Sequence, residues 1–194
     1  IVDAASRLKT DGYVRLVDPN ISSKRLKEMG VRKAIEGIYD GQTRRHEVIE
    51  PLAEAIRTHG LTRGYFDRLI VARERDLDDA PAESVAAVEP YAEESAAPLV
   101  SLALECVGAD AAGLVDLARH SGSAWALSGL MRAVPYYAAQ GRSMLPRSVA
   151  GEGSDHVAAI VGISDAARYH VGRARQLRKG LPIAVKRATL QAVL

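Results

Sequence analysis

Apolar residues recur along most of the chain at the three- and four-residue spacing of amphipathic helices, and no long alternating pattern typical of a strand interrupts them. Glycine, proline and small polar residues divide this pattern into seven helical segments. The expected helices span residues 22–39, 48–59, 62–80, 84–107, 110–134, 154–180 and 183–194. We therefore predict an all-α protein, with a poorly defined segment at residues 1–20 and one helical domain at residues 21–194.

Particular residues mark the predicted helix ends. Thr62, Ser84 and Asp110 can accept hydrogen bonds from the free N–H groups of a first helical turn, which makes them candidate N-caps. Pro135 has no amide N–H and is expected to end the fifth helix at Val134. Glycine tolerates the left-handed conformation that often follows a helix. The glycines expected in this role are Gly41, Gly60, Gly108 and Gly180.

Composition limits the classes of function. The 194 residues are 47% hydrophobic and 26% charged with a formal net charge of +2, which excludes a disordered chain and gives no sign of nucleic-acid binding. The single cysteine, Cys106, cannot form an internal disulfide and is expected to be buried and inert in an apolar helix. The five histidines have no zinc-like spacing, so no metal site is predicted.

One segment carries more information than the helical pattern. Residues 116–146 read DLARHSGSAWALSGLMRAVPYYAAQGRSMLP. They resemble the squalene/phytoene synthase superfamily, whose active members have a glycine-containing helix that leads into the motif N-x-x-R-D-x-x-E-D, followed after a few residues by G-R-x-Y-L-P. The matching residues are Gly122, Arg132, Gly141, Arg142, Leu145 and Pro146. This resemblance implies a single isoprenoid-synthase-like helical bundle around a central cavity.

The departures from the motif concern its metal ligands. At the positions that match the family's Gln, Asn, first Asp, Glu and second Asp, this chain has Ala126, Gly129, Ala133, Tyr136 and Tyr137. None of these supplies the carboxylate that Mg²⁺ prefers. Residues 1–20 contain no D-x-x-x-D, and we expect the N-terminal segment to be incomplete. No cofactor is therefore expected, and Mg²⁺ only if the protein is an active synthase.

The variant motif R-A-x-P-Y, present here from Arg132 to Tyr136, resembles the branch of the superfamily that contains the mitochondrial complex I assembly factors and their bacterial relatives. That resemblance implies a non-catalytic protein that acts in NADH dehydrogenase assembly or binds a lipid or isoprenoid. It also implies a cytoplasmic or peripheral inner-membrane location in bacteria, or the matrix side in mitochondria. The alternative is an active prenyltransferase that condenses isoprenyl diphosphates.

Several charged residues are candidate ligand contacts, each with a structural alternative. Asp76 and Asp79 form either a diphosphate or metal site or a solvated helix end, and the second is more common for charge runs. His120 either contacts a phosphate or is a hydrogen-bonded, half-buried histidine. Arg132 and Arg142 either bind an anion or form salt bridges within the bundle.

Two further features bear on lipids. Tyr136 and Tyr137 either line a lipid-sized cavity or pack in the core. Residues 168–187 are rich in Lys and Arg and contain no Asp or Glu, which suits either an anionic membrane surface or a solvated face.

Overall fold

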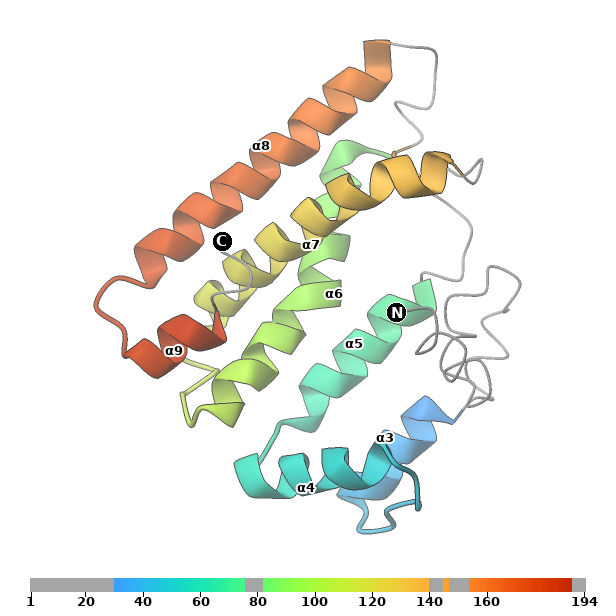
Figure 1. Ribbon diagram of the computed structural model, residues 1–194, viewed down its shortest axis with the longest axis vertical. Coiled ribbons are helices and arrows are strands. Elements are labelled where there is room, and N and C mark those ends of the chain that lie inside the picture. Colours follow the sequence, from blue (N-terminus) through green and yellow to red (C-terminus); the bar gives the residue numbers. More distant parts are fainter. Residues whose placement is uncertain (1–29, 76–81, 140–144, 147–153, 190–194) are drawn as a thin grey trace.

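The computed structural model describes residues 30–75, 82–139, 145–146 and 154–189. Within these ranges the chain forms seven helices and no strand, which confirms the all-α prediction. Figure 1 shows how these helices are arranged. The helices are α3 (Val31–Tyr39), α4 (Ile49–His59), α5 (Arg63–Arg75), α6 (Val85–Cys106), α7 (Val115–Ala138), α8 (Ser154–Leu177) and α9 (Ile183–Ala188). The predicted boundary between residues 1–20 and 21–194 lies outside the described residues.

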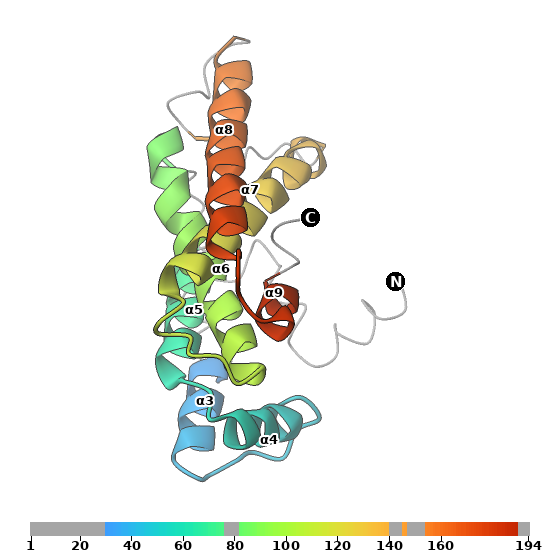
Figure 2. The same cartoon turned by 90° about the vertical axis from the view of Figure 1, so that its left-hand side faces the viewer.

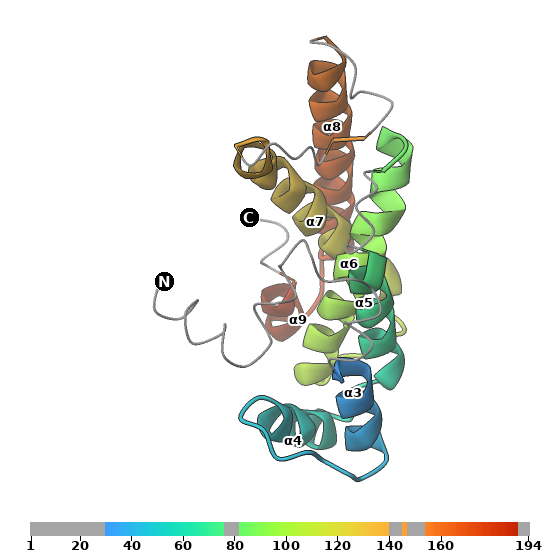
Figure 3. The ribbon, with the colours of Figure 1, turned by 90° about the vertical axis from the view of Figure 1, so that its right-hand side faces the viewer.

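The long helices pack in the order in which they occur along the chain. The most extensive contacts join α5 to α6, α6 to α7, and α7 to α8. Helices α3 and α4 lie at one end of the molecule, while the beginning of α8 lies at the other end (Figure 2). The short α9 packs back against α6, and Figure 3 shows it on the same side of α6 as α7.

Three apolar clusters hold these helices together. One joins α6, α7 and the first half of α8 around Leu127 and Ile163. A second joins the far ends of α6, α7 and α8 to α9 around Leu104 and Leu117. A third packs α3, α4 and α5 onto α6 around Ile56. Helix α6 contributes to all three clusters and is therefore the central element of the fold.

Helices α6 and α7 approach each other unusually closely at Gly122. A methyl group added there would lie 2.5 Å from the amide nitrogen and 2.6 Å from the Cα of Ala97. The residues around this contact are small and buried: Ser95, Ala96, Ser121, Ser123 and Ala124. Only glycine fits this position, which gives a structural reason for the glycine that the motif comparison singled out.

Most predicted helix ends are confirmed. The Ser84 hydroxyl accepts a hydrogen bond of 3.3 Å from the N–H of Ala87 at the start of α6. The four glycines expected after helices all have positive φ and close those segments: Gly41, Gly60, Gly108 and Gly180. The first described helix, however, begins at Val31, after Gly30 with φ of 78°. A continuous helix from residue 22 to 39 is therefore wrong.

Two predicted N-caps are wrong, because each side chain is engaged in another hydrogen bond. Thr62 does not cap α5 with its hydroxyl, which instead donates to Glu105 Oε1 at 2.6 Å. Glu105, at the end of α6, also accepts the Thr62 N–H at 2.9 Å through Oε2. The Asp110 carboxylate accepts from the N–H of Ala112 at 3.1 Å, within a turn that precedes the first residue of α7, Val115.

Two further expectations are corrected at the ends of α6 and α7. Helix α7 continues through Pro135 to Ala138, and the carbonyl of Pro135 accepts a helical hydrogen bond of 3.1 Å from Ala139. Packing of neighbouring residues such as Val134 against the core holds the chain helical despite the missing N–H. Cys106 is exposed rather than buried, because it is the last residue of α6.

Candidate functional site

The outward face of α7 is the first component of the candidate site. Trp125, Gly129, Arg132 and Tyr136 follow one another at spacings of four, three and four residues, which places them on one side of a helix. Trp125 is 40% exposed and Tyr136 is 65% exposed, although both are large aromatic residues. The opposite side of α7, including Leu127, is buried in the core. The side of α7 that carries Gly129, Arg132 and Tyr136 is therefore accessible to a ligand.

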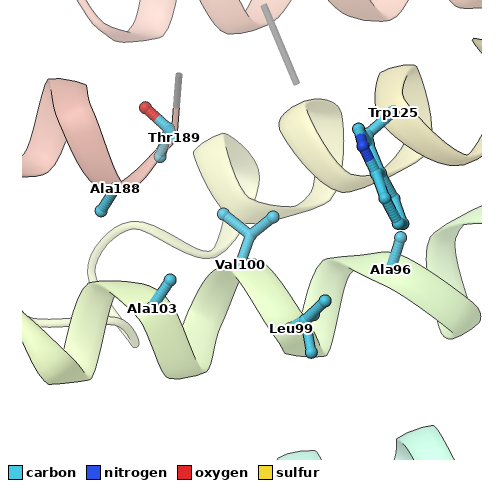
Figure 4. Close-up of a pocket in the computed structure, with 7 residues that line it drawn as sticks. All are labelled: Ala96, Leu99, Val100, Ala103, Trp125, Ala188 and Thr189. Carbon is cyan, nitrogen blue, oxygen red and sulfur yellow. The ribbon is translucent and has the colours of Figure 1, made fainter. Parts of the chain in front are cut away.

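An apolar groove lies beside Trp125. It is lined by Ala96, Leu99, Val100, Ala103, Trp125, Ala188 and Thr189, from α6, α7 and the end of α9, and has a volume of about 100 Å³. In Figure 4 the indole of Trp125 stands at one end, Thr189 stands near the other, and the α6 side chains lie between them. The Thr189 hydroxyl already donates within α9, to the carbonyl of Val185 at 3.2 Å. The lining therefore suits a hydrocarbon.

Arg132 provides a positive charge on the same face. Its side chain is exposed and extends toward Gly129, where an added methyl group would lie 4.0 Å from Arg132 Nη2. Among the described residues, no acidic side chain forms a salt bridge with Arg132. Arg132 lies about 10 Å from Trp125 along the helix axis, at 1.5 Å per residue. An apolar surface and a cation thus lie one after the other along α7.

The remaining motif positions are distributed between the surface and the core. Ala126 packs against the cluster around Leu127, and Ala133 is half-buried. Leu145 and Pro146 are buried, and Leu145 belongs to the same cluster. Tyr137 belongs to α7, but its side chain is outside the described part of the chain, as are Asp76, Asp79 and Arg142.

The residues of this face do not fit a magnesium site. Residues 117–138 contain no Asp or Glu, so the face of α7 between Trp125 and Tyr136 has no carboxylate to offer a hard cation. Among the described residues there is also no group of three or more His, Cys, Asp or Glu side chains that could hold a metal ion.

In the part of the chain that the structure describes, no helix combines the length and the apolar character needed to cross a membrane.

His120 lies away from this face, in a buried chain of hydrogen bonds. It is 4% exposed, and its Nδ1 lies 2.8 Å from Nδ1 of His170, on α8. Nε2 of His170 lies 2.8 Å from Glu89 Oε1, on α6. Burial is the main cause that lowers the pKa of His120, followed by the neighbouring His170. No local sequence pattern indicates these hydrogen bonds, because the residues that form them lie on three different helices.

The groove was also missed. Leu99 and Trp125 appear in the sequence as ordinary apolar members of helical patterns. No local signal distinguishes an apolar residue that faces a groove from one that faces the core. Spacing alone does place Trp125 on the same side of α7 as Gly129 and Arg132, and this is the one signal that relates the groove to the motif.

Comparisons with known proteins identify the fold and the family. The chain superposes on a squalene synthase from Alicyclobacillus acidocaldarius with a TM-score of 0.72 at 19% identity, over 87% of this chain and 69% of that one. It is 26% identical to bovine NADH dehydrogenase (ubiquinone) complex I, assembly factor 6, over 84% of this chain and 53% of that protein. It is 29% identical to presqualene diphosphate synthase from Rhodopseudomonas palustris, over 69% of this chain and 50% of that protein.

The chain thus spans about half the length of the curated relatives that it matches. A sequence profile described as squalene/phytoene synthase covers residues 11–194, which is nearly the whole chain. The resemblance found in the α7 motif therefore extends far beyond that motif, and the chain belongs to the squalene/phytoene synthase family.

Proposed function

We propose that this chain is a non-catalytic member of the family that acts in the assembly of respiratory complex I, the NADH dehydrogenase. One observation carries the proposal: the positions that match the first Asp, the Glu and the second Asp of an active synthase are Ala133, Tyr136 and Tyr137, and none of them has a carboxylate. Similarity to complex I assembly factor 6 over 84% of the chain supports the assembly role. The corresponding location is the inner membrane surface, on the matrix side in mitochondria.

We further propose that the face of α7 binds an isoprenoid or a lipid. The groove beside Trp125 accepts part of a hydrocarbon chain, and Arg132 lies where an anionic head group would extend along the helix. At about 100 Å³ the groove is smaller than the several hundred Å³ of typical ligand pockets, so most of the chain would lie along the surface.

An activity assay separates the proposed role from the alternative, an active prenyltransferase. The protein is incubated with farnesyl or geranylgeranyl diphosphate, Mg²⁺ and a reductant, and released diphosphate is measured. An active synthase of the same family, assayed in parallel, is the positive control. We expect no release above the background without protein. Measurable turnover would contradict the non-catalytic proposal and favour the prenyltransferase.

Ligand binding is measured separately, with Trp125 as the reporter because it is the only tryptophan. Farnesyl diphosphate should shift the fluorescence of Trp125 to shorter wavelength as the indole is covered. Leu99→Ser should weaken binding about tenfold by removing one apolar side chain from the groove. Val161→Ser is the matched control: Val161 is 48% exposed, similar to 51% for Leu99, but lies on α8 outside the groove.

The head group is tested at Arg132. Arg132→Gln should weaken the binding of farnesyl diphosphate but leave the binding of farnesol unchanged, because only the diphosphate carries a charge for the guanidinium to contact. Equal effects on both ligands would contradict the proposed placement of the head group. An unchanged Trp125 spectrum with every ligand would rule out the groove as their site.

The assembly role is tested in the source organism. Deletion of the gene should lower NADH oxidation by isolated membranes, and the wild-type gene should restore it. A tagged form of the full protein should co-purify with NADH dehydrogenase subunits. Intact NADH oxidation after deletion, together with no co-purified subunit, would contradict the assembly role while leaving the ligand measurements valid.

A further inference from the structure

Two buried histidines join the three central helices. His120 on α7 and His170 on α8 are each 4% exposed, and their Nδ1 atoms lie 2.8 Å apart. His170 continues to Glu89 of α6 at 2.8 Å, and His120 Nε2 lies 3.5 Å from Arg119 Nη2. The outer two side chains reach solvent, with Glu89 46% and Arg119 42% exposed. These contacts therefore form a series that runs from the exposed carboxylate of Glu89 to the exposed guanidinium of Arg119 through two buried rings.

When both rings are neutral, only one placement of their ring protons allows every one of these hydrogen bonds. Arg119 can only donate, so Nε2 of His120 is the acceptor and its proton resides on Nδ1. That proton is donated to Nδ1 of His170, which leaves the single ring proton of His170 on Nε2, where it is donated to Glu89. Both neutral imidazoles thus use all of their nitrogen atoms, and the three helices are joined without a buried charge.

Added protons change this series of hydrogen bonds in two steps. The first proton is best placed on His170, whose charge then lies beside the Glu89 carboxylate, and His120 accepts the remaining Nδ1–H. This step loses the 3.5 Å contact between Arg119 and His120, because Nε2 of His120 then carries the proton and both groups are donors. A second proton leaves two donors facing each other across 2.8 Å, and the rings can no longer remain in contact.

The charged groups around His120 make that second proton costly. The groups that face His120 are Arg119 and Asp116 from α7, and His170, Arg173 and the ring of Tyr169 from α8, while Glu89 from α6 contacts His170. Burial and the three basic neighbours all lower the pKa of His120, and Asp116 alone raises it. The folded state therefore resists a proton that the unfolded state accepts.

We propose that His120 and His170 form a proton-binding latch that holds α8 against α6 and α7 at neutral pH and releases it when both rings are protonated. The α7–α8 contact is among the largest in the fold, and the latch lies within it. Release would expose the apolar side of α8 around Ala167 and Ala174. The proposal does not depend on the role in complex I assembly or on the ligand.

The test measures hydrogen exchange of the α8 amides in the full chain, together with imidazole NMR signals, from about pH 8 to pH 5. After correction for the intrinsic exchange rate, the opening constant of α8 should rise about tenfold per pH unit below about 6.5, for one linked proton. Over the same range the imidazole signal of His120 should titrate as α8 opens. Opening of α8 that is independent of pH would overturn the latch.

Two variants complete the test. His120→Gln keeps an N–H donor for His170 but cannot be protonated, so its α8 exchange should lose the dependence on pH. His59→Gln replaces an exposed histidine of α4 and should keep the wild-type dependence. A dependence on pH that persists in His120→Gln would also overturn the proposal. If His120→Gln does not fold, the coupled titration and exchange of the wild-type protein decide the outcome.

Discussion

Replacement of Gly122 by alanine tests the close contact between α6 and α7. The added methyl would lie 2.5 Å and 2.6 Å from the nitrogen and Cα of Ala97, and 2.7 Å from the carbonyl carbon of Ala96. Favourable contacts between carbon atoms need about 3.5–4.0 Å, so the two helices would have to separate by roughly 1 Å. All three atoms belong to the backbone, so a change of side-chain rotamer cannot relieve the overlap.

The expected cost follows from two opposing terms. Overpacking of a tight interior costs about 1–3 kcal/mol, and more where backbone must move, as it must here. Alanine is favoured over glycine within a helix by about 1 kcal/mol, which offsets part of this cost. We expect Gly122→Ala to lower the free energy of unfolding by about 2–3 kcal/mol. For a chain of this length, the melting temperature should fall by roughly 4–12 °C.

Thermal unfolding followed by far-ultraviolet circular dichroism measures this change, with Gly172→Ala as the matched control. Gly172 is an exposed glycine within α8, and a methyl group added there meets nothing within 4 Å. The control should therefore melt higher than wild type, because only the helix propensity changes. A melting temperature for Gly122→Ala at or above that of wild type would refute the argument from close packing.

Three further substitutions test other contacts. Ser123→Ala removes a buried hydroxyl that has no hydrogen-bond partner, and should raise the urea midpoint by an amount equivalent to about 1 kcal/mol; a loss of that size would contradict the assignment. Glu105→Ala removes both acceptors of Thr62 and should lower the free energy of unfolding by about 1 kcal/mol in the same measurement. The Tyr39 hydroxyl donates to the carbonyl of Leu61 at 2.6 Å, and burial raises the pKa of Tyr39 above its usual value. The folded state then keeps a phenol proton that the unfolded state loses, so the free energy of unfolding should decrease as pH rises above about 10. Tyr39→Phe should lack that part of the decrease. An identical decrease in both proteins would contradict this role of Tyr39.

The predictable part of the fold was the part determined locally. Gly60 and Gly108 adopt positive φ directly after helices, and Ser84 caps α6, because each depends on a few adjacent residues. Thr62 failed as a cap because its hydroxyl donates instead to Glu105, 43 residues along the chain. Pro135 failed as a helix end because its neighbours pack against the core. In both cases, contacts with distant residues outweighed the local preference.

The candidate site also has one part that the sequence indicates locally and another that depends on how the helices pack. The loss of carboxylates at Ala133 and Tyr136 is a property of the sequence, and helical spacing places Trp125 on the same side of α7 as Tyr136. The groove required α6 and α9 to be placed against α7, and no pattern specifies their relative positions. The contact between His120 and His170 likewise joins residues 50 positions apart.

The sequential packing of α5, α6, α7 and α8 has a kinetic consequence. Each large contact joins helices that are neighbours in the chain, so few interactions require the closure of a long loop. Proteins with such low contact order fold quickly for their size. A nascent chain can add each helix to the one before it as synthesis proceeds, and α8 joins last among the four. The latch residue His170 thus becomes available only after the α6–α7 pair is already in place.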